Sequence, residues 1–121
     1  AERIRDASDS VYKELGAGRR ESAYQMALQL ELHKKYQTLL QTEVNVPVQY
    51  RGFSVAVERL DLYLPGVILA EVKAVSKLQA SHDSQTLAYI RDMQVPGVLI
   101  NFPNREGQNL EFRYHRLREV A

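Results

Sequence analysis

Apolar residues recur at helical spacing over the first 36 positions of the sequence. Two stripes, each with members three or four residues apart, predict amphipathic helices over 3–15 and over about 20–36. The members of these stripes are Ile4, Ala7, Val11 and Leu15 in the first, and Tyr24, Leu28 and Leu32 in the second. We therefore expect two helices joined by the short glycine-containing segment 16–18.

The pattern changes from helical to strand-like after Thr42. Valines at positions 44, 46 and 48 alternate with other residues, and Pro47 favours an edge strand because proline cannot donate a hydrogen bond to a neighbouring strand. Turns at Arg51-Gly52 and Pro65-Gly66 then separate two further strands, 53–64 and 67–75. This middle part of the chain is predicted to form an antiparallel three-stranded meander.

The last third of the sequence predicts one helix and two strands. A helix is expected over 78–92, the apolar run 98–100 is typical of a buried strand, and alternation over 110–114 predicts a final strand. The predicted order is ααβββαββ, within one domain that spans 1–121. The fold class is therefore α/β of the mixed (α+β) kind.

Composition narrows the classes of function. With 45% hydrophobic and 26% charged residues, the chain resembles an ordinary globular protein. Its longest purely apolar run, 67–70, is far shorter than the roughly 18 residues of a membrane-spanning helix, and we expect a cytoplasmic protein without membrane contact. The absence of cysteine from this sequence excludes disulfides, thiol catalysis and thiolate metal sites, and a net charge of +1 means that nucleic-acid binding would need local positive charge.

The segment around the Pro65-Gly66 turn carries the most informative chemistry. A three-residue loop would pair Leu64 with Ile68, Leu62 with Ala70 and Leu60 with Val72, which puts all six on one buried face. The other face then carries Asp61 across from Glu71, with Lys73 two residues along. A two-residue loop would instead put the two carboxylates on opposite faces.

Two carboxylates that face each other favour a bound cation, because their charges repel. Mg²⁺ or Mn²⁺ fits a site of one or two carboxylates completed by water and phosphate. Lys73 is then placed to orient a water molecule or to stabilise charge on a phosphate, and burial of the pair should raise the pKa of at least one carboxyl group. The alternative is a solvated, charged hairpin face without a metal.

Two further signals come from the predicted helices. Gln85 and Tyr89 lie four residues apart and so share a helix face, which could look toward the same cleft, although such a pair also arises by chance. Glu21 would add a carboxylate if the second helix packs near the meander, although a glutamate in a first helical turn is often a capping residue. We expect all three side chains to converge on the cleft that contains Asp61 and Glu71.

Taken together, these residues resemble the GxxExxY protein family over nearly the whole chain. Gly18 to Tyr24 matches the Gly-x-x-Glu-x-x-Tyr signature, with Glu21 at its centre. The similarity continues in the same order through Asp61, Glu71 to Val75, Gln85 with Tyr89, and Gly97 to Phe102. That family is placed in the PD-(D/E)XK nuclease superfamily, whose core is a mixed sheet flanked by helices, as in restriction endonucleases.

The resemblance implies a role for each site residue. It implies that Asp61 and Glu71 are metal ligands, that the backbone carbonyl of Val72 is a third, that Lys73 is the catalytic lysine and that Glu21 completes the acidic cluster. Gln85 and Tyr89 resemble the Gln-x-x-x-Tyr element of RecB-type members, and are counted with the catalytic residues on that ground.

The expected function is a Mg²⁺- or Mn²⁺-dependent nuclease that hydrolyses phosphodiester bonds by metal-activated water, with DNA as the expected substrate. The expected contacts to the nucleic-acid backbone are Arg19, Arg20, Lys77, Arg113 and Arg116. One alternative is a catalytically silent nuclease fold that binds nucleic acid or a protein, and another is a junction-resolving endonuclease. A domain this small leaves little room for a recognition module, so a homodimer or a larger complex is also expected.

Overall fold

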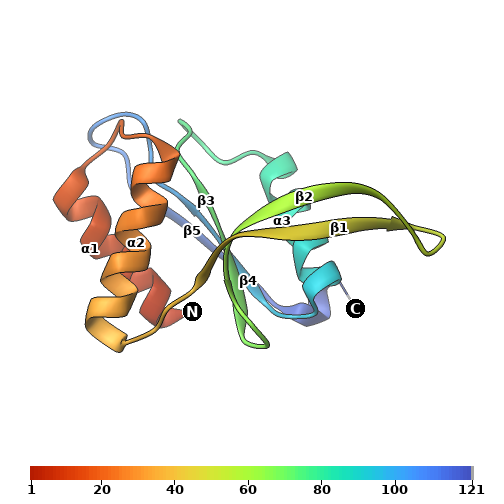
Figure 1. Ribbon diagram of the computed structural model, residues 1–121. Helices are drawn as coiled ribbons and strands as arrows, with labels where there is room; N and C mark the ends of the chain where they lie inside the picture. The colour runs from red at the N-terminus through yellow and green to blue at the C-terminus, as the bar shows by residue number, and fades with distance from the viewer. Residues whose placement is uncertain (121) are drawn as a thin grey trace.

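The elements follow one another in the predicted order (Figure 1). The computed structural model describes residues 1–120. Its helices and strands are α1 (Glu2–Leu15), α2 (Glu21–Tyr36), β1 (Gln41–Tyr50), β2 (Phe53–Leu64), β3 (Ile68–Lys73), α3 (Ala80–Met93), β4 (Gly97–Asn101) and β5 (Glu111–His115). A short 3₁₀ helix, Leu117–Glu119, follows the last strand and had no counterpart in the prediction. No helix of the described residues is long and apolar enough to cross a membrane.

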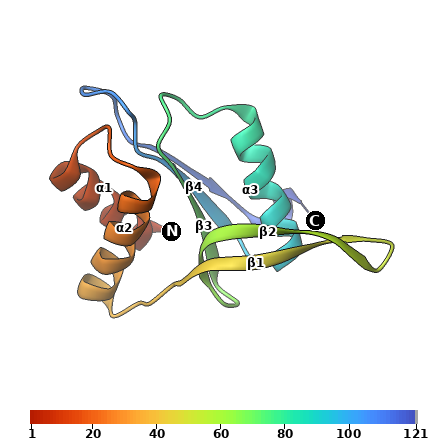
Figure 2. The same ribbon diagram turned by 45° about the horizontal axis from the view of Figure 1, so that its top comes forward.

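The strands form one mixed sheet in the order β1-β2-β3-β4-β5. The first three strands are the predicted antiparallel meander, and β1 is an edge strand, as Pro47 indicated. β3 and β4 are parallel and are joined through α3, whereas β5 returns antiparallel to β4. Helices α1 and α2 cover one face of the sheet and α3 lies on the other (Figures 1 and 2).

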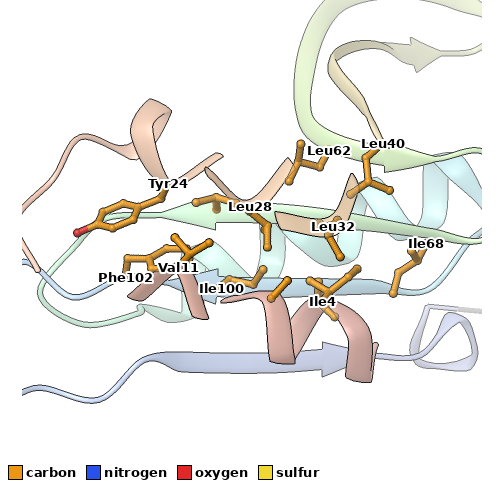
Figure 3. Packing of buried hydrophobic residues seen from close by; sticks show 14 residues of the cluster. Ile4, Val11, Tyr24, Leu28, Leu32, Leu40, Leu62, Ile68, Ile100 and Phe102 are labelled. Carbon is orange, nitrogen blue, oxygen red and sulfur yellow. The ribbon is translucent and has the colours of Figure 1, made fainter. Parts of the chain in front are cut away.

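Each face of the sheet has its own apolar core. On the face covered by α1 and α2, the apolar stripes predicted for these helices pack on alternate residues of β3 and β4. Figure 3 shows Leu28 and Leu32 above Ile100 and Ile68. On the other face, Tyr89 and Ile90 of α3 pack against Leu69 of β3. Because both faces of β3 are covered, five of its six residues are buried.

The register of the β2–β3 hairpin is the predicted one near the turn and departs from it further along. Leu64 pairs with Ile68 and Leu62 with Ala70, but the pairing stops before Leu60 and Val72. The expectation that Leu60 shares a buried face with Leu62 is wrong, since Leu60 belongs to the core under α3 and Leu62 to the core under α1 and α2. β2 therefore turns over between these residues, where it leaves β3 and continues with β1 as a projecting hairpin (Figure 1).

Gly97 marks the closest approach of α3 to the sheet. A Cβ atom at this position would lie 2.6 Å from Leu69 Cδ1 and 3.0 Å from Ile90 Cγ1, and both of these side chains are fully buried. Gly97→Ala should therefore destabilise the fold by about 2 kcal/mol, because added atoms in a packed core force its neighbours apart. Thermal unfolding should show a fall in Tm of roughly 8 °C, while the matched change Ser84→Ala on the exposed side of α3 should leave the Tm within about 2 °C. An unchanged Tm for Gly97→Ala would contradict this packing.

Candidate functional site

Asp61 and Glu71 bridge β2 and β3 at the point where the two strands separate. The backbone N–H of Asp61 donates to Glu71 Oε2 at 2.8 Å, and the backbone N–H of Val72 donates to Asp61 Oδ2 at 2.8 Å. Each carboxyl group thus replaces a missing hydrogen bond between the two strands. The predicted opposition of Asp61 and Glu71 is present, and its reciprocal geometry holds both groups in place.

The environment of this pair favours the protonated form of both groups. Burial raises the pKa of Glu71 to about 8, and the neighbouring charge of Asp61 adds to the effect. Burial also raises the pKa of Asp61, although the hydrogen bond from Val72 opposes this change. The hydrogen bond between the two carboxyl groups raises the pKa of Glu71 and lowers that of Asp61. The expected rise of at least one carboxyl pKa is confirmed.

A chain of hydrogen bonds connects Lys73 to β2 through α3. Gln85 Oε1 accepts from Lys73 Nζ at 3.3 Å, and Gln85 Nε2 donates to the Tyr89 hydroxyl at 3.4 Å. The Tyr89 hydroxyl in turn donates to the backbone carbonyl of Arg59 at 3.0 Å. Gln85 therefore positions the ammonium group, and Tyr89 anchors β2 two residues before Asp61. Burial and the charge of Glu71 raise the pKa of Tyr89 to about 12, so its hydroxyl keeps its proton.

Glu21 lies in the first turn of α2, within reach of the charges in the site. Burial raises its pKa, and the charge of Asp61 raises it further whereas that of Lys73 lowers it. Gln85 and Tyr89 of α3 and Glu21 of α2 thus lie near the same charged residues, Asp61, Glu71 and Lys73.

The rest of the Gly-x-x-Glu-x-x-Tyr segment supports the loop in front of Glu21. The Tyr24 hydroxyl donates to the Gly16 carbonyl at 2.6 Å and accepts from the Arg19 N–H at 3.1 Å, while its ring stacks on Phe102 at 4.2 Å. Gly18 has φ of 86°, a conformation that favours glycine. In this motif Gly18 and Tyr24 shape the loop, and Glu21 is the residue that reaches the site.

Glu43 is a charged neighbour of the site that the sequence did not reveal. Thr42 pairs with Leu62 and Val44 with Leu60, which places Glu43 opposite Asp61. Its charge raises the pKa of both Glu21 and Asp61, although burial is the larger cause in each case. Counting back from the Arg51-Gly52 turn would put Glu43 opposite Leu60 instead, but a bulge between Val48 and Gln49 shifts the register by one.

The donor chemistry of the carboxylate pair fits a hard divalent cation. Across residues 1–120, no three His, Asp or Glu side chains are grouped closely enough to hold a metal, so Glu21 stands outside the pair formed by Asp61 and Glu71. In the described chain these two groups receive donors only from each other and from two backbone N–H groups. Two carboxylates completed by water and phosphate form a ligand set that suits Mg²⁺ or Mn²⁺.

Asn101 fixes the segment that follows Lys73. It is fully buried, its Oδ1 accepts from the Val75 N–H at 2.9 Å, and its Nδ2 donates to the Val75 carbonyl and to Glu111 Oε1, each at 2.9 Å. Glu111 also accepts from the Leu78 N–H at 3.0 Å. A polar residue directly after the apolar run 98–100 is the signal in the sequence that could have indicated this clamp.

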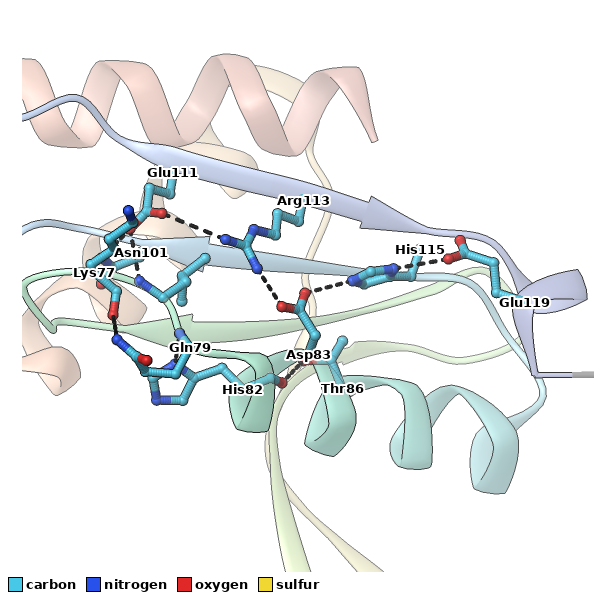
Figure 4. Close-up of polar contacts among 11 residues, drawn as sticks. Lys77, Gln79, His82, Asp83, Thr86, Asn101, Glu111, Arg113, His115 and Glu119 are labelled. Carbon is cyan, nitrogen blue, oxygen red and sulfur yellow. Dashed lines mark hydrogen bonds and ion pairs between the residues drawn. The ribbon is translucent and has the colours of Figure 1, made fainter.

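The predicted phosphate contacts fall into two groups. Arg19, Arg20, Lys77 and Arg116 have exposed side chains. Arg113 instead forms ion pairs with Asp83 and Glu111, and His115 Nε2 lies 2.9 Å from Asp83 (Figure 4). The charge of Arg113 is matched within the protein, so its role is to hold β5 against α3.

Comparison with known families agrees with the fold. The mixed sheet with helices on both faces is consistent with a nuclease-like class of protein. The family model described as the PD-(D/E)XK nuclease superfamily matches residues 1–113, and the chain belongs to this superfamily. Searches among curated proteins and among solved structures gave no match.

Proposed function

We propose that this protein is a nuclease that cleaves phosphodiester bonds in DNA with the help of Mg²⁺ or Mn²⁺. Membership of the superfamily supports a nuclease-type function. The observation that carries the proposal is the pair formed by the buried Glu71 and the half-buried Asp61, with Lys73 on the same strand as Glu71 and held by Gln85. A structural carboxylate pair would not need a positioned ammonium group beside it.

The proposed roles follow from the positions of the side chains. Asp61 and Glu71, with the backbone carbonyl of Val72, would hold the divalent ion, which when bound supplies positive charge to a phosphate and lowers the pKa of water. Glu71 must first release its proton, since its pKa is about 8 in the metal-free protein. Glu21 adds negative charge at the margin of the site.

Lys73 is the residue proposed to act on the substrate. Gln85 accepts one of its hydrogen bonds and leaves the other ammonium hydrogens free, and the described residues offer it no ion pair within 4.0 Å. The ammonium group can therefore donate to a phosphate oxygen or to the attacking water. Arg19, Arg20, Lys77 and Arg116 are the proposed contacts to the nucleic-acid backbone, and Arg113 is left out because two carboxylates already neutralise it.

A cleavage assay tests the proposal and separates it from its alternatives. Purified protein should cut linear DNA when Mg²⁺ or Mn²⁺ is present and should be inactive with a chelator. Single-stranded DNA, branched DNA and RNA offered in parallel would distinguish a general nuclease from a junction-resolving enzyme. Binding without cleavage on every substrate and with either ion would overturn the proposed activity and favour a silent nuclease fold.

Metal binding should also be visible without any substrate. Mn²⁺ or Mg²⁺ should raise the Tm by several degrees, because a ligand that binds only the folded state stabilises it by about 2.7 kcal/mol at one hundred times its Kd. Asp61→Asn should abolish the gain, whereas Asp9→Asn on α1 should retain it. Equal gains in these two variants, measured by calorimetry, would show that the carboxylate pair does not hold the ion.

A further inference from the structure

The outer half of the β1–β2 hairpin carries exposed apolar side chains on both of its faces. A bulge leaves Val55 without a partner in β1, so Phe53 and Val57 lie on opposite faces of the hairpin. Phe53, Val55 and Val57 are 74%, 60% and 61% exposed. Tyr50, which pairs with Phe53, is 60% exposed. The face that carries Tyr50 and Phe53 is covered nearer the root of the hairpin, where Val46, four residues before Tyr50 on the same strand, is buried in the core under α3. Figure 1 shows the hairpin projecting away from the rest of the sheet.

A second exposed apolar surface lies at the root of the same hairpin. Met26 and Leu30 of α2 and Leu39 are 60%, 62% and 65% exposed. They line a groove of about 480 Å³ that continues to Thr42 and Glu43 at the start of β1. We call this surface the α2 groove. The hairpin leaves from its edge and points away, so the tip of the hairpin lies far from the groove of its own chain.

The charges on these two surfaces are complementary. Between positions 44 and 57 the hairpin has one charged residue, Arg51, at its tip. The lining of the α2 groove also has one charged residue, Glu43, whose side chain is 51% exposed and lies 3.7 Å from Arg59. An almost uncharged hairpin with a single arginine suits an apolar protein surface with a single carboxylate, and does not suit a phosphate backbone.

We propose that two copies of this chain form a dimer in which the hairpin of each copy lies in the α2 groove of the other. A twofold contact requires that one chain carry both complementary surfaces, and this chain does. Because the twofold axis repeats the contact, each chain contributes the exposed apolar side chains of both its hairpin and its groove.

The contact involves the faces of the hairpins and not their edges. Pro47 lies in the middle of edge strand β1 and has no N–H, so it interrupts pairing between two such edges. In the proposed dimer Arg51 of each hairpin approaches Glu43 of the other copy, next to Asp61. The candidate site of one copy is thus bordered by the hairpin of its partner.

Sedimentation equilibrium or light scattering tests the proposal directly. The protein should have about twice its chain mass of 13.9 kDa at concentrations near 100 µM. Phe53→Glu and Met26→Glu should each raise the dimer Kd at least tenfold, whereas Tyr114→Glu, at an exposed residue of β5, should not. A monomer of the parent chain at this concentration, or a dimer that is unaffected by both substitutions, would overturn the proposal.

Two mixing experiments distinguish reciprocal exchange from a general apolar contact. Phe53→Glu damages only the hairpin and Met26→Glu only the groove, so an equimolar mixture should form a heterodimer through one intact contact. Arg51→Glu should weaken the dimer. The double variant with Glu43→Arg should bind at least tenfold more tightly than Arg51→Glu alone. Failure of both the mixture and the charge exchange, with circular dichroism showing folded variants, would refute this arrangement.

Discussion

Lys73→Ala is expected to lower the rate of DNA cleavage by about 10²-fold or more, as removal of one positioned electrostatic group does in other active sites. The side chain is half-buried and Gln85 holds its ammonium group at 3.3 Å, so its position is set before any substrate binds. Single-turnover cleavage at saturating metal measures the loss directly. The variant should fold normally and should keep the metal-dependent gain in Tm, because the two carboxylates remain.

Two comparisons show whether the effect belongs to the ammonium group itself. Lys13→Ala, at an exposed lysine of α1, removes the same charge far from the site and should leave the rate unchanged. Gln85→Ala should give a smaller loss than Lys73→Ala, since Lys73 keeps its charge and loses only its orientation. A Lys73→Ala variant that cleaves as fast as the parent would exclude Lys73 from the mechanism.

Glu71→Gln should make the metal-free protein more stable at alkaline pH by several kcal/mol, because each unit between the folded and the unfolded pKa of Glu71 corresponds to about 1.4 kcal/mol. The pKa of Glu71 is about 8 in the folded protein and close to 4.5 when unfolded. Its contribution to stability is therefore present below pH 4.5 and is lost as the pH rises toward 8. Glutamine imitates the protonated acid, because its amide can accept from the Asp61 N–H and donate to the Asp61 carboxyl group.

Urea unfolding of both proteins between pH 4 and pH 9 measures this difference. The two curves of stability against pH should agree near pH 4, separate as the pH rises from 4.5 to about 8, and run parallel above pH 8. Titrating groups away from the carboxylate pair, such as His115, are present in both proteins and cancel in the comparison. With Mg²⁺ or Mn²⁺ present, the parent protein should become the more stable of the two at high pH, since only it can bind the ion with both carboxylates. Parallel curves over the whole range would show that Glu71 has an ordinary pKa.

Local patterns in the sequence carried most of the predictable structure. The helices and strands follow from apolar periodicity and from glycine and proline turns, and both depend on residues close together in the chain. The three-residue loop after Leu64 set the register of β2 and β3, and with it the opposition of Asp61 and Glu71. Gln85 and Tyr89 share a helix face because they are four residues apart, and this face does reach Lys73.

The residues that surround this pair depended on contacts between distant segments. The bulge at Val48 brings Glu43 opposite Asp61, and neither turn chemistry nor alternation indicated it. Arg113 looked like a free positive charge, but Asp83, thirty residues earlier in the chain, neutralises it. The pair of Asp83 and Arg113 forms only when α3 packs against the sheet.

The sequence by itself thus determined the elements, their order and the paired carboxylates, because short-range periodicity and one tight turn are enough to specify them. The tertiary structure decided that β2 turns over between Leu60 and Leu62, so that these residues enter opposite cores. An apolar residue carries no information about which face will bury it when helices cover both faces of a sheet. Contacts with α3 decide which face buries Leu60. Tyr89 donates a hydrogen bond to the Arg59 carbonyl, and Ile90 packs in the same core as Leu60.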